Sequence, residues 1–286
     1  MLVREEIAAH CKAFDEKISR GIEEFGGPTK LRDACYYALT TGGKRFRPLI
    51  VLLIAEALGK GKDVSAAALS VEFFHTASLI ADDLPCMDND DNRRNKPSLH
   101  RVYGESVALL ASYALITAAF QKIHENAQDP RAGMLALEAA SRCAGILGAT
   151  GGQFFDLYPP EPSLQAVEQV IYLKTVTLFE VCFVFGWVFG GGDLSKLDRV
   201  KMAAYHFGMA FQTADDLEDL LQDAEREKVT SLGHWLGCEG ALSYFSDQVT
   251  LLNAVLEELG LLTPHFQYLI GLMEERAQAS LAGQDT

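Results

Sequence analysis

The chain has 286 residues, of which 49% are hydrophobic, and a formal net charge of −14 at pH 7. This length and apolar content are those of an ordinary globular protein that buries a large core, so we expect a single domain over residues 1–286. The acidic excess argues against a nucleic-acid partner, because such proteins usually carry an excess of Lys and Arg to neutralise phosphates.

Helical periodicity runs through almost the whole chain. Residues 64–84 and 104–127 place apolar side chains three and four positions apart and are rich in Ala and Leu, which predicts helices. Gly and Pro breakers separate such stretches, and no convincing strand or hairpin appears. Several of these helices are apolar on most sides, as interior helices are. The sequence therefore predicts an all-α fold, built as one large helical bundle.

An acidic cluster, DDLPCMDNDD at residues 82–91, follows the first of these helices and is followed by Arg93 and Arg94. The C-terminal end of a helix carries a negative partial charge, so aspartates there are disfavoured by the helix dipole as well as by each other. A bound cation would reverse both effects. The alternative is a solvated acidic loop, because runs of like charge usually lie in solvent.

The most apolar run of the chain, residues 181–192, is much shorter than the roughly 20 residues that a bilayer requires. We interpret it as a buried helix and expect no stable membrane insertion. The six cysteines include no CxxC pair, and the first residues contain no apolar signal core. We therefore expect the protein in the reducing cytoplasm.

A second acidic cluster lies in the helical pattern of residues 211–223, where Asp215 and Asp219 are four positions apart and Asp216 is adjacent. Taken alone, it could be an exposed acidic helix face. Two aspartate-rich segments on two helices of one bundle could instead face each other across a cavity. Neither cluster has a His or Cys at metal-ligand spacing, and oxygen-only ligands suit Mg²⁺ rather than zinc.

Five motifs follow one another along the chain: GGKRFRP at 42–48, HTASLIADDLPCMDNDDNRRNKPSLH at 75–100, GGQFFDL at 151–157, KT at 174–175 and FQTADDLED at 211–219. In this order they resemble the trans-isoprenyl diphosphate synthases of the polyprenyl synthetase family, in particular the short-chain farnesyl and geranylgeranyl diphosphate synthases. The resemblance implies a homodimeric prenyltransferase with an isoprenoid synthase bundle, whose two aspartate-rich helices face each other across a central cavity. It also implies three Mg²⁺ ions per active site and head-to-tail condensation of isopentenyl diphosphate with an allylic diphosphate.

By this resemblance, the catalytic carboxylates are Asp82, Asp83, Asp88, Asp215, Asp216 and Asp219. Asp82, Asp88 and Asp215 would ligate Mg²⁺, and the other three would be further or water-mediated ligands. The residues expected to contact the allylic diphosphate are Arg93, Lys174, Thr175, Gln212 and Lys228. Isopentenyl diphosphate needs a basic pocket without bridging metal ions, and the matching residues are Lys44, Arg47, His75 and Arg94. Gln153 and Asp156 would at most support these groups.

The chain departs from the family pattern at several positions. Ala81 replaces a His, Asn95 replaces a Gly, LASYAL at 110–115 replaces LAGDAL, and Glu218 replaces an apolar residue. The segment that leads to Lys228 is also short. These departures leave open a non-catalytic partner subunit of the same fold, although the retained aspartates favour an active enzyme. A terpene cyclase is a weaker alternative, because it would leave Lys44, Arg47 and His75 unexplained.

Two residues of the helix before the first aspartate motif bear on product length. The growing prenyl chain should extend along this helix, so that Ala77, five residues before Asp82, and Phe74, eight before it, would form its floor. Farnesyl-type enzymes of the family often have an aromatic residue at the first of these positions. Ala77 leaves that level open and Phe74 closes the next, which predicts geranylgeranyl diphosphate as the product. Farnesyl diphosphate is the alternative, because Tyr113 or Phe120 could narrow the cavity.

Overall fold

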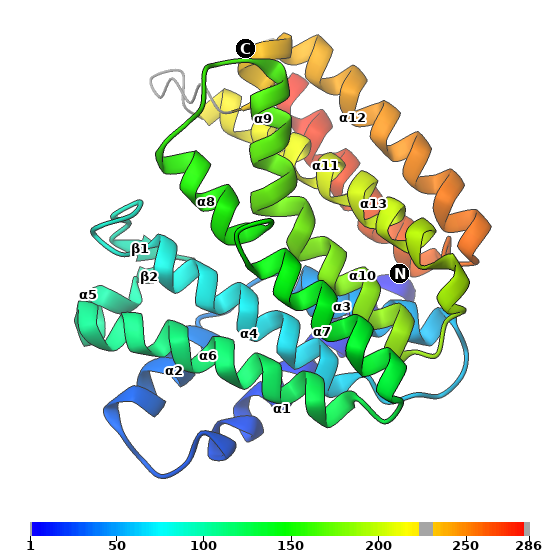
Figure 1. Cartoon of the computed structure of the whole chain (residues 1–286). Coiled ribbons are helices and arrows are strands. Elements are labelled where there is room, and N and C mark those ends of the chain that lie inside the picture. The colour runs from blue at the N-terminus through cyan, green and yellow to red at the C-terminus, as the bar shows by residue number, and fades with distance from the viewer. Residues whose placement is uncertain (1, 223–230, 283–286) are drawn as a thin grey trace.

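The computed structural model describes residues 2–222 and 231–282, and nearly all of this part is helical (Figure 1). In chain order the longer helices are α1 (Leu2–Gly21), α2 (Lys30–Thr40), α3 (Phe46–Ala57), α4 (Ser65–Asp82), α5 (Leu99–Tyr103), α6 (Glu105–Asn126), α7 (Pro130–Ala144), α8 (Ala149–Leu157), α9 (Leu164–Ile171), α10 (Thr177–Phe189), α11 (Leu197–Gln222), α12 (Leu232–Leu259) and α13 (Pro264–Ala282). Short helical turns are η1 (Ile22–Phe25), η2 (Tyr172–Val176) and η3 (Leu194–Lys196), and the strands are β1 (Asn92–Arg93) and β2 (Lys96–Pro97). The predicted all-α bundle is confirmed.

Helix α4 carries the first aspartate motif at its C-terminal end. Its Ala, Leu and Phe side chains are buried along most of its length, because it packs against α6 on one side and α3 and α10 on the other. The helix ends at Asp82, shortly before Pro85, which cannot continue a helix. The prediction of an interior helix that presents its aspartates at its end is therefore confirmed.

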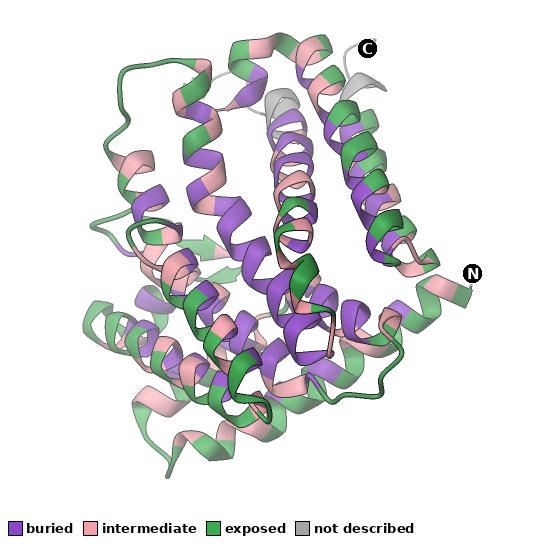
Figure 2. Ribbon diagram, turned by 45° about the vertical axis from the view of Figure 1, so that its right-hand side comes forward, coloured by how far each residue is buried: buried purple, intermediate pink, exposed green. Residues whose placement is uncertain are grey.

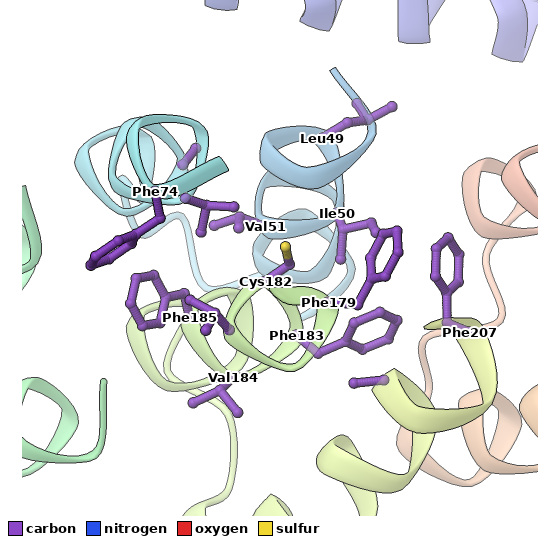
Figure 3. Packing of buried hydrophobic residues seen from close by; sticks show 14 of the residues in the cluster. Leu49, Ile50, Val51, Phe74, Phe179, Cys182, Phe183, Val184, Phe185 and Phe207 are labelled. Carbon is purple, nitrogen blue, oxygen red and sulfur yellow. The ribbon is translucent and has the colours of Figure 1, made fainter. Parts of the chain in front are cut away.

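Helix α10 runs through the middle of the bundle, and every residue from Thr177 to Phe189 is buried (Figure 2). Its aromatic side chains, among them Phe179 and Phe183, pack between Ile50 of α3 and Phe207 of α11 (Figure 3). The helix approaches α3 closely at Gly186, where a Cβ atom would lie 2.8 Å from Cβ of Ile54. The apolar run at residues 181–192 is thus a core helix over most of its length, as predicted.

Two stretches of the described chain are long and apolar enough to cross a bilayer by composition alone. One is residues 164–189, and 83% of its most apolar window is buried inside the bundle, as expected for a core helix. The other is α6, of which 39% is buried in the corresponding window. The apolar surface that α6 leaves exposed bears on the oligomeric state proposed below.

A small hairpin follows the first aspartate motif, where the sequence predicted no strand. Asn92 pairs with Pro97 and Arg93 with Lys96 in an antiparallel arrangement. The two turn residues, Arg94 and Asn95, both adopt left-handed backbone conformations, with φ angles of 54° and 61°. Asn tolerates this region better than most residues, which explains how it can replace the Gly of the family pattern. Strands of two residues are too short to produce a detectable alternation.

Candidate active site

After α4 ends at Asp82, the chain of the first aspartate motif folds back toward the C-terminal end of this helix. The backbone N–H of Asp88 donates a hydrogen bond to the carbonyl oxygen of Asp82 at 2.9 Å, which brings the two carboxyl-bearing residues together. Burial raises the pKa of Asp82 from its usual 3.8 to about 6, against the opposing effect of Lys174, and the negative charge of Asp88 adds to the rise. Within the described residues no hydrogen bond reaches the Asp82 carboxylate. A cation at this position would stabilise the ionised form of this buried carboxylate.

Asp83 is oriented differently and holds Arg93. The Nε of Arg93 donates to Oδ1 of the buried Asp83 at 2.9 Å, and its Nη2 donates to the same oxygen and to Oδ2 of Asp90, the latter at 3.0 Å. Burial raises the pKa of Asp83, and its contacts with Arg93 oppose that rise. In this arrangement Asp83 positions the guanidinium of Arg93 beside the motif.

Helix α8, which contains GGQFFDL, supports both the aspartate motif and Lys174. Gln153 Nε2 donates to Oδ1 of Asp88 at 3.1 Å, and Lys174 Nζ donates to Oδ2 of Asp156 at 2.5 Å. The close approach requires Gly152, because a Cβ atom there would lie 2.4 Å from the backbone nitrogen of Lys174. Gln153 and Asp156 therefore contact two of the predicted site residues, and their supporting role stays a prediction.

Lys174 and the adjacent Thr175 lie in η2, a single π-helical turn, a feature found frequently at functional sites. Thr175 Oγ1 donates to Oε1 of Gln212 at 2.8 Å, and Gln212 Nε2 donates to Oδ1 of Asp216 at 2.9 Å. The other oxygen of Asp216 accepts the backbone N–H of Leu232 at 2.8 Å. Two consecutive residues of η2 thus contact α8, through Asp156, and the second aspartate motif, through Gln212.

The second aspartate motif has a partner that the sequence analysis did not identify. Arg276 of α13 forms an ion pair with Asp215, and its Nε and Nη2 donate to Oε2 of Glu218 at 2.9 and 2.6 Å. The unusual Glu218 was the only sequence signal of this contact. The side chain of Asp219 and the whole of Lys228 lie outside the described residues, so the predictions for both stay predictions.

Basic residues from three segments gather near the start of α3. Arg94 donates to the carbonyl oxygen of Gly42, and its guanidinium carbon would lie 2.6 Å from a Cβ atom at Gly43, whose φ of 135° also demands glycine. Arg47 Nη1 lies 3.4 Å from Nε2 of His75. Lys44 is exposed at the same loop. The GGKR segment is therefore shaped to admit the Arg94 side chain.

Two buried atoms of this basic group lack a hydrogen-bond partner within the described residues, Nε of Arg47 and Nδ1 of His75. Burial lowers the pKa of His75 well below its usual 6.5, and the charge of Arg47 adds to this effect. The Arg47 guanidinium also lies 4.7 Å from the centre of the Phe179 ring. Unsatisfied donors beside several arginines are suited to an anion.

A buried ion pair, Arg45 with Glu72, lies next to this basic group. Arg45 and Glu72 are both almost completely buried and form an ion pair, while Arg45 Nη2 donates to the carbonyl oxygen of Leu39 at 2.8 Å and its Nε to Asp15 at 2.8 Å. Arg45 adopts a left-handed conformation, with a φ of 51°, directly before α3. The pair fixes the backbone between Lys44 and Arg47, and the sequence analysis assigned it no role.

A cavity of about 450 Å³ leads from the first aspartate motif into the bundle. Asp82 and Lys174 line it at one end, Ala77 and Ser112 along its walls, and Phe74 among its apolar residues. Both residues predicted to set the product length therefore line this cavity.

Phe74 is held by Phe120 of α6, with the ring centres 5.2 Å apart in an edge-to-face arrangement. A second, much smaller cavity of about 10 Å³ is lined by Phe74, Leu178 and Val181. Because Phe74 and Leu178 line both spaces, the Phe74 ring is part of the partition between them.

Among the side chains that the structure describes, which exclude that of Asp219, no three Asp, Glu, His or Cys residues converge on one point that could hold a metal ion. Mg²⁺ typically binds one or two carboxylates in proteins and completes its shell with water and substrate phosphates. Asp82, Asp88 and Asp215 supply the oxygen donors that such an ion prefers. The donor set is therefore compatible with ions that a diphosphate bridges.

The family model described as polyprenyl synthetase matches residues 28–230. The chain belongs to the polyprenyl synthetase family. This polyprenyl synthetase is 38% identical over 224 residues to the farnesyl diphosphate synthase of Geobacillus stearothermophilus, covering 76% of the chain and 75% of that relative. It is also 38% identical over 208 residues to geranylgeranyl pyrophosphate synthase 3 of Arabidopsis thaliana, covering 69% of the chain and 58% of that relative.

Among solved structures, the geranyltranstransferase of Thermotoga maritima matches this polyprenyl synthetase with a TM-score of 0.82 and 31% identity, covering 96% of the chain and 99% of that structure. The geranyltransferase of Legionella pneumophila matches in fold, with a TM-score of 0.85 and 24% identity over 98% of both chains. The predicted isoprenoid synthase fold is confirmed, and the prediction of a prenyltransferase is confirmed at the level of the family.

Proposed function

We propose that the protein condenses isopentenyl diphosphate with an allylic diphosphate, head to tail, and that its product is geranylgeranyl diphosphate. The observation that carries this proposal is the apolar cavity of about 450 Å³ that begins at Asp82 and Lys174 and ends against Phe74. Such a cavity offers an apolar environment to a prenyl chain whose diphosphate stays at the polar end.

The polar end provides the groups that the first step requires. When bound, Mg²⁺ neutralises the charge that develops on the departing pyrophosphate. Asp82, Asp88 and Asp215 would hold these ions. Asp216 accepts hydrogen bonds on both oxygens, one from Gln212 and one from the backbone N–H of Leu232. Asp216 would therefore position the side chain of Gln212.

The allylic diphosphate would contact Arg93, Lys174, Thr175 and Gln212, with Lys228 as a further proposed contact. The contacts of Arg93 with Asp83 and of Lys174 with Asp156 support this assignment, because they orient Arg93 beside the first aspartate motif and Lys174 in the wall of the cavity. Their donors supply the charge-assisted hydrogen bonds that an anionic leaving group needs.

Isopentenyl diphosphate would bind to Lys44, Arg47, His75 and Arg94. The partnerless buried atoms of Arg47 and His75 support this assignment, because a phosphate oxygen would satisfy the arginine donor and a protonated phosphate or water the imidazole nitrogen. The left-handed conformation of Arg94 is a local backbone strain of the kind that concentrates at ligand sites. A neutral His75 would avoid adding a further positive charge beside the arginines.

Product length would be set by the partition around Phe74. Ala77 leaves the cavity open one turn from Asp82, and Phe74 closes it three residues deeper, about 4.5 Å along a helix axis. Farnesyl diphosphate remains the second candidate product, because the Geobacillus relative carries that name and Phe120 packs beside the floor.

We further propose a homodimer formed through α6 and α7. Leu110 and Tyr113 of α6 expose 52% and 56% of their surfaces, and Met134 of α7 exposes 66%. Large apolar side chains gathered on neighbouring helices mark an interaction surface. The exposed Tyr113, which stands in the altered LASYAL motif, would then contact the partner.

The decisive experiment incubates the purified chain alone with Mg²⁺, isopentenyl diphosphate and, in turn, dimethylallyl, geranyl and farnesyl diphosphate. Chromatography of the dephosphorylated products should show a twenty-carbon alcohol from each starter. A fifteen-carbon end product would favour the farnesyl alternative. Absence of any product, with the helical signal intact, would favour the non-catalytic partner subunit.

Asp215→Ala provides the matched control for that assay. The variant should lose turnover while it retains the helical circular dichroism of the parent chain, because loss of one partly exposed ion pair with Arg276 costs little and creates no cavity in the core. An unchanged rate would contradict the proposed position of the metal ions.

A further inference from the structure

Arg276 is the cation of the second aspartate motif that the proposed chemistry leaves unused. It is half-buried on α13 and reaches across to α11, where Asp215 and Glu218 lie three residues apart and on the same side of the helix. Its Nη1 pairs with Asp215, while Nε and Nη2 both donate to one oxygen of Glu218. One guanidinium thus bridges the two carboxylates.

Glu218 gives this bridge its geometry. Like charges at this helical spacing repel each other, so Glu218 beside Asp215 would destabilise α11 without a counter-charge. The fork of the guanidinium presents separate N–H groups to the two acids, which an ammonium group could not do with the same fixed geometry. The guanidinium also lies 5.8 Å from the centre of the Phe211 ring, which further limits its position.

The ion pair between Arg276 and Asp215 opposes the binding of a metal ion to Asp215. The positive charge of a paired guanidinium offsets the negative charge that the carboxylate offers to another cation, so the ion pair with Arg276 competes with a metal ion for Asp215. Glu218 lies outside the proposed ligand set, so its two hydrogen bonds to Arg276 can persist when Asp215 is released.

We propose that Arg276 is a positioning residue that neutralises Asp215 until Mg²⁺ and the diphosphate bind, and that Glu218 retains Arg276 beside the motif after Asp215 is released. This inference rests on the proposed function, because it takes Asp215 as a ligand of the ion. It assigns a role to Glu218, which departs from the family pattern. The pair stabilises the end of α11 in the absence of the metal ion and raises the Mg²⁺ concentration needed to fill the site.

Thermal unfolding against MgCl₂ concentration, with inorganic pyrophosphate held constant, tests the proposal without measuring turnover. Arg276→Gln should unfold at a lower temperature than the parent chain in EDTA, because it removes a counter-charge from Asp215 and Glu218. It should reach half-maximal stabilisation at about fivefold lower Mg²⁺ concentration, the factor that corresponds to about 1 kcal/mol for a partly exposed ion pair. Arg276→Lys should restore only part of the parent behaviour, because it returns the positive charge but not the fork that reaches both acids.

Arg199→Gln is the matched control. Arg199 also lies on α11 and makes an ion pair through two of its nitrogens, with Glu258 of α12. Its removal should lower the unfolding temperature but leave the Mg²⁺ concentration for half-maximal stabilisation unchanged. An equal shift in both variants would mean that loss of any ion pair on α11 alters the titration, and would overturn the proposal.

Asp215→Asn separates the two levels of the argument. If Mg²⁺ stabilises the parent chain and Asp215→Asn weakens that effect, Asp215 is a ligand; an Arg276→Gln titration that coincides with the parent then refutes the role of Arg276 alone. If Asp215→Asn titrates like the parent, or Mg²⁺ with pyrophosphate gives no stabilisation, both the proposed ligand and the role of Arg276 are refuted.

Discussion

Asp82 allows a quantitative test of how the first aspartate motif is held. Its pKa is about 6 in the folded chain, against a usual value of 3.8 that we take for the unfolded chain. The folded state therefore binds the proton more readily than the unfolded state between these two values. The contribution of Asp82 to stability is most favourable below pH 3.8 and is lost as the pH rises through 6.

Asp82→Asn removes this titration and should stabilise the metal-free protein at neutral and alkaline pH. The two pKa values differ by about 2, and each pKa unit corresponds to about 1.4 kcal/mol, so the gain over the parent chain should approach about 3 kcal/mol at pH 8. At pH 5, where the folded carboxyl is mostly protonated, the gain should fall to about half of that. The same variant should lose turnover, because the amide cannot replace a carboxylate ligand of Mg²⁺.

The measurement is equilibrium unfolding in urea with EDTA, followed by the helical circular dichroism signal at pH 8 and pH 5. Asp247→Asn, at an exposed position of α12, is the control and should change the free energy of unfolding by less than about 0.5 kcal/mol at both pH values. If Asp82→Asn is no more stable than the parent at pH 8, or if its gain is independent of pH, burial of an ionised Asp82 is not the cause and the reasoning fails.

Three further outcomes are expected. Arg94→Ala should raise the Michaelis constant for isopentenyl diphosphate much more than that for the allylic substrate; equal increases would show that the residue serves both sites. Ala77→Tyr should shorten the product to fifteen carbons. Phe74→Ala should lengthen the product beyond twenty carbons, because it would join the two cavities. If chromatography shows no shift in product length for either variant, the floor of the cavity lies elsewhere. Glu72→Gln should lower the free energy of unfolding in urea by about 3 to 5 kcal/mol, because it leaves the buried Arg45 without its nearest counter-charge; a loss under about 1 kcal/mol would contradict that account.

The sequence alone predicted the structural features that depend on neighbouring residues in the chain. The period of apolar residues before Asp82 predicted α4 and its end, and the spacing of Asp215 and Asp219 placed them on one helix. These features depend on interactions within a few turns of helix or on a single breaker such as Pro85, so the chain records them directly.

Other features depend on contacts between distant segments or on rare backbone conformations. The pairing of Arg276 with Asp215 joins two helices, and nothing in either local pattern specifies which faces meet. The turn at Arg94 and Asn95 requires two successive left-handed residues, an arrangement with Arg in one position that turn rules do not anticipate. Among the unpredicted features, the contact of Arg276 left one trace in the sequence, Glu218, as a charge in an apolar position, and the turn left another, Asn95 in place of a Gly.

The π-helical turn η2 has a consequence for how this chain tolerates change in length. An α-helix turns about 100° per residue, so one extra residue in a single wide turn offsets the phase of α9 from that of α10 by about the same angle. Both flanking helices have packed faces fixed by other elements. Deletion of one residue between Tyr172 and Val176 would therefore rotate one helix against its neighbours instead of closing the turn locally. The length of the turn between α9 and α10 is therefore constrained by the packing of both helices, independently of the side chains that Lys174 and Thr175 contribute.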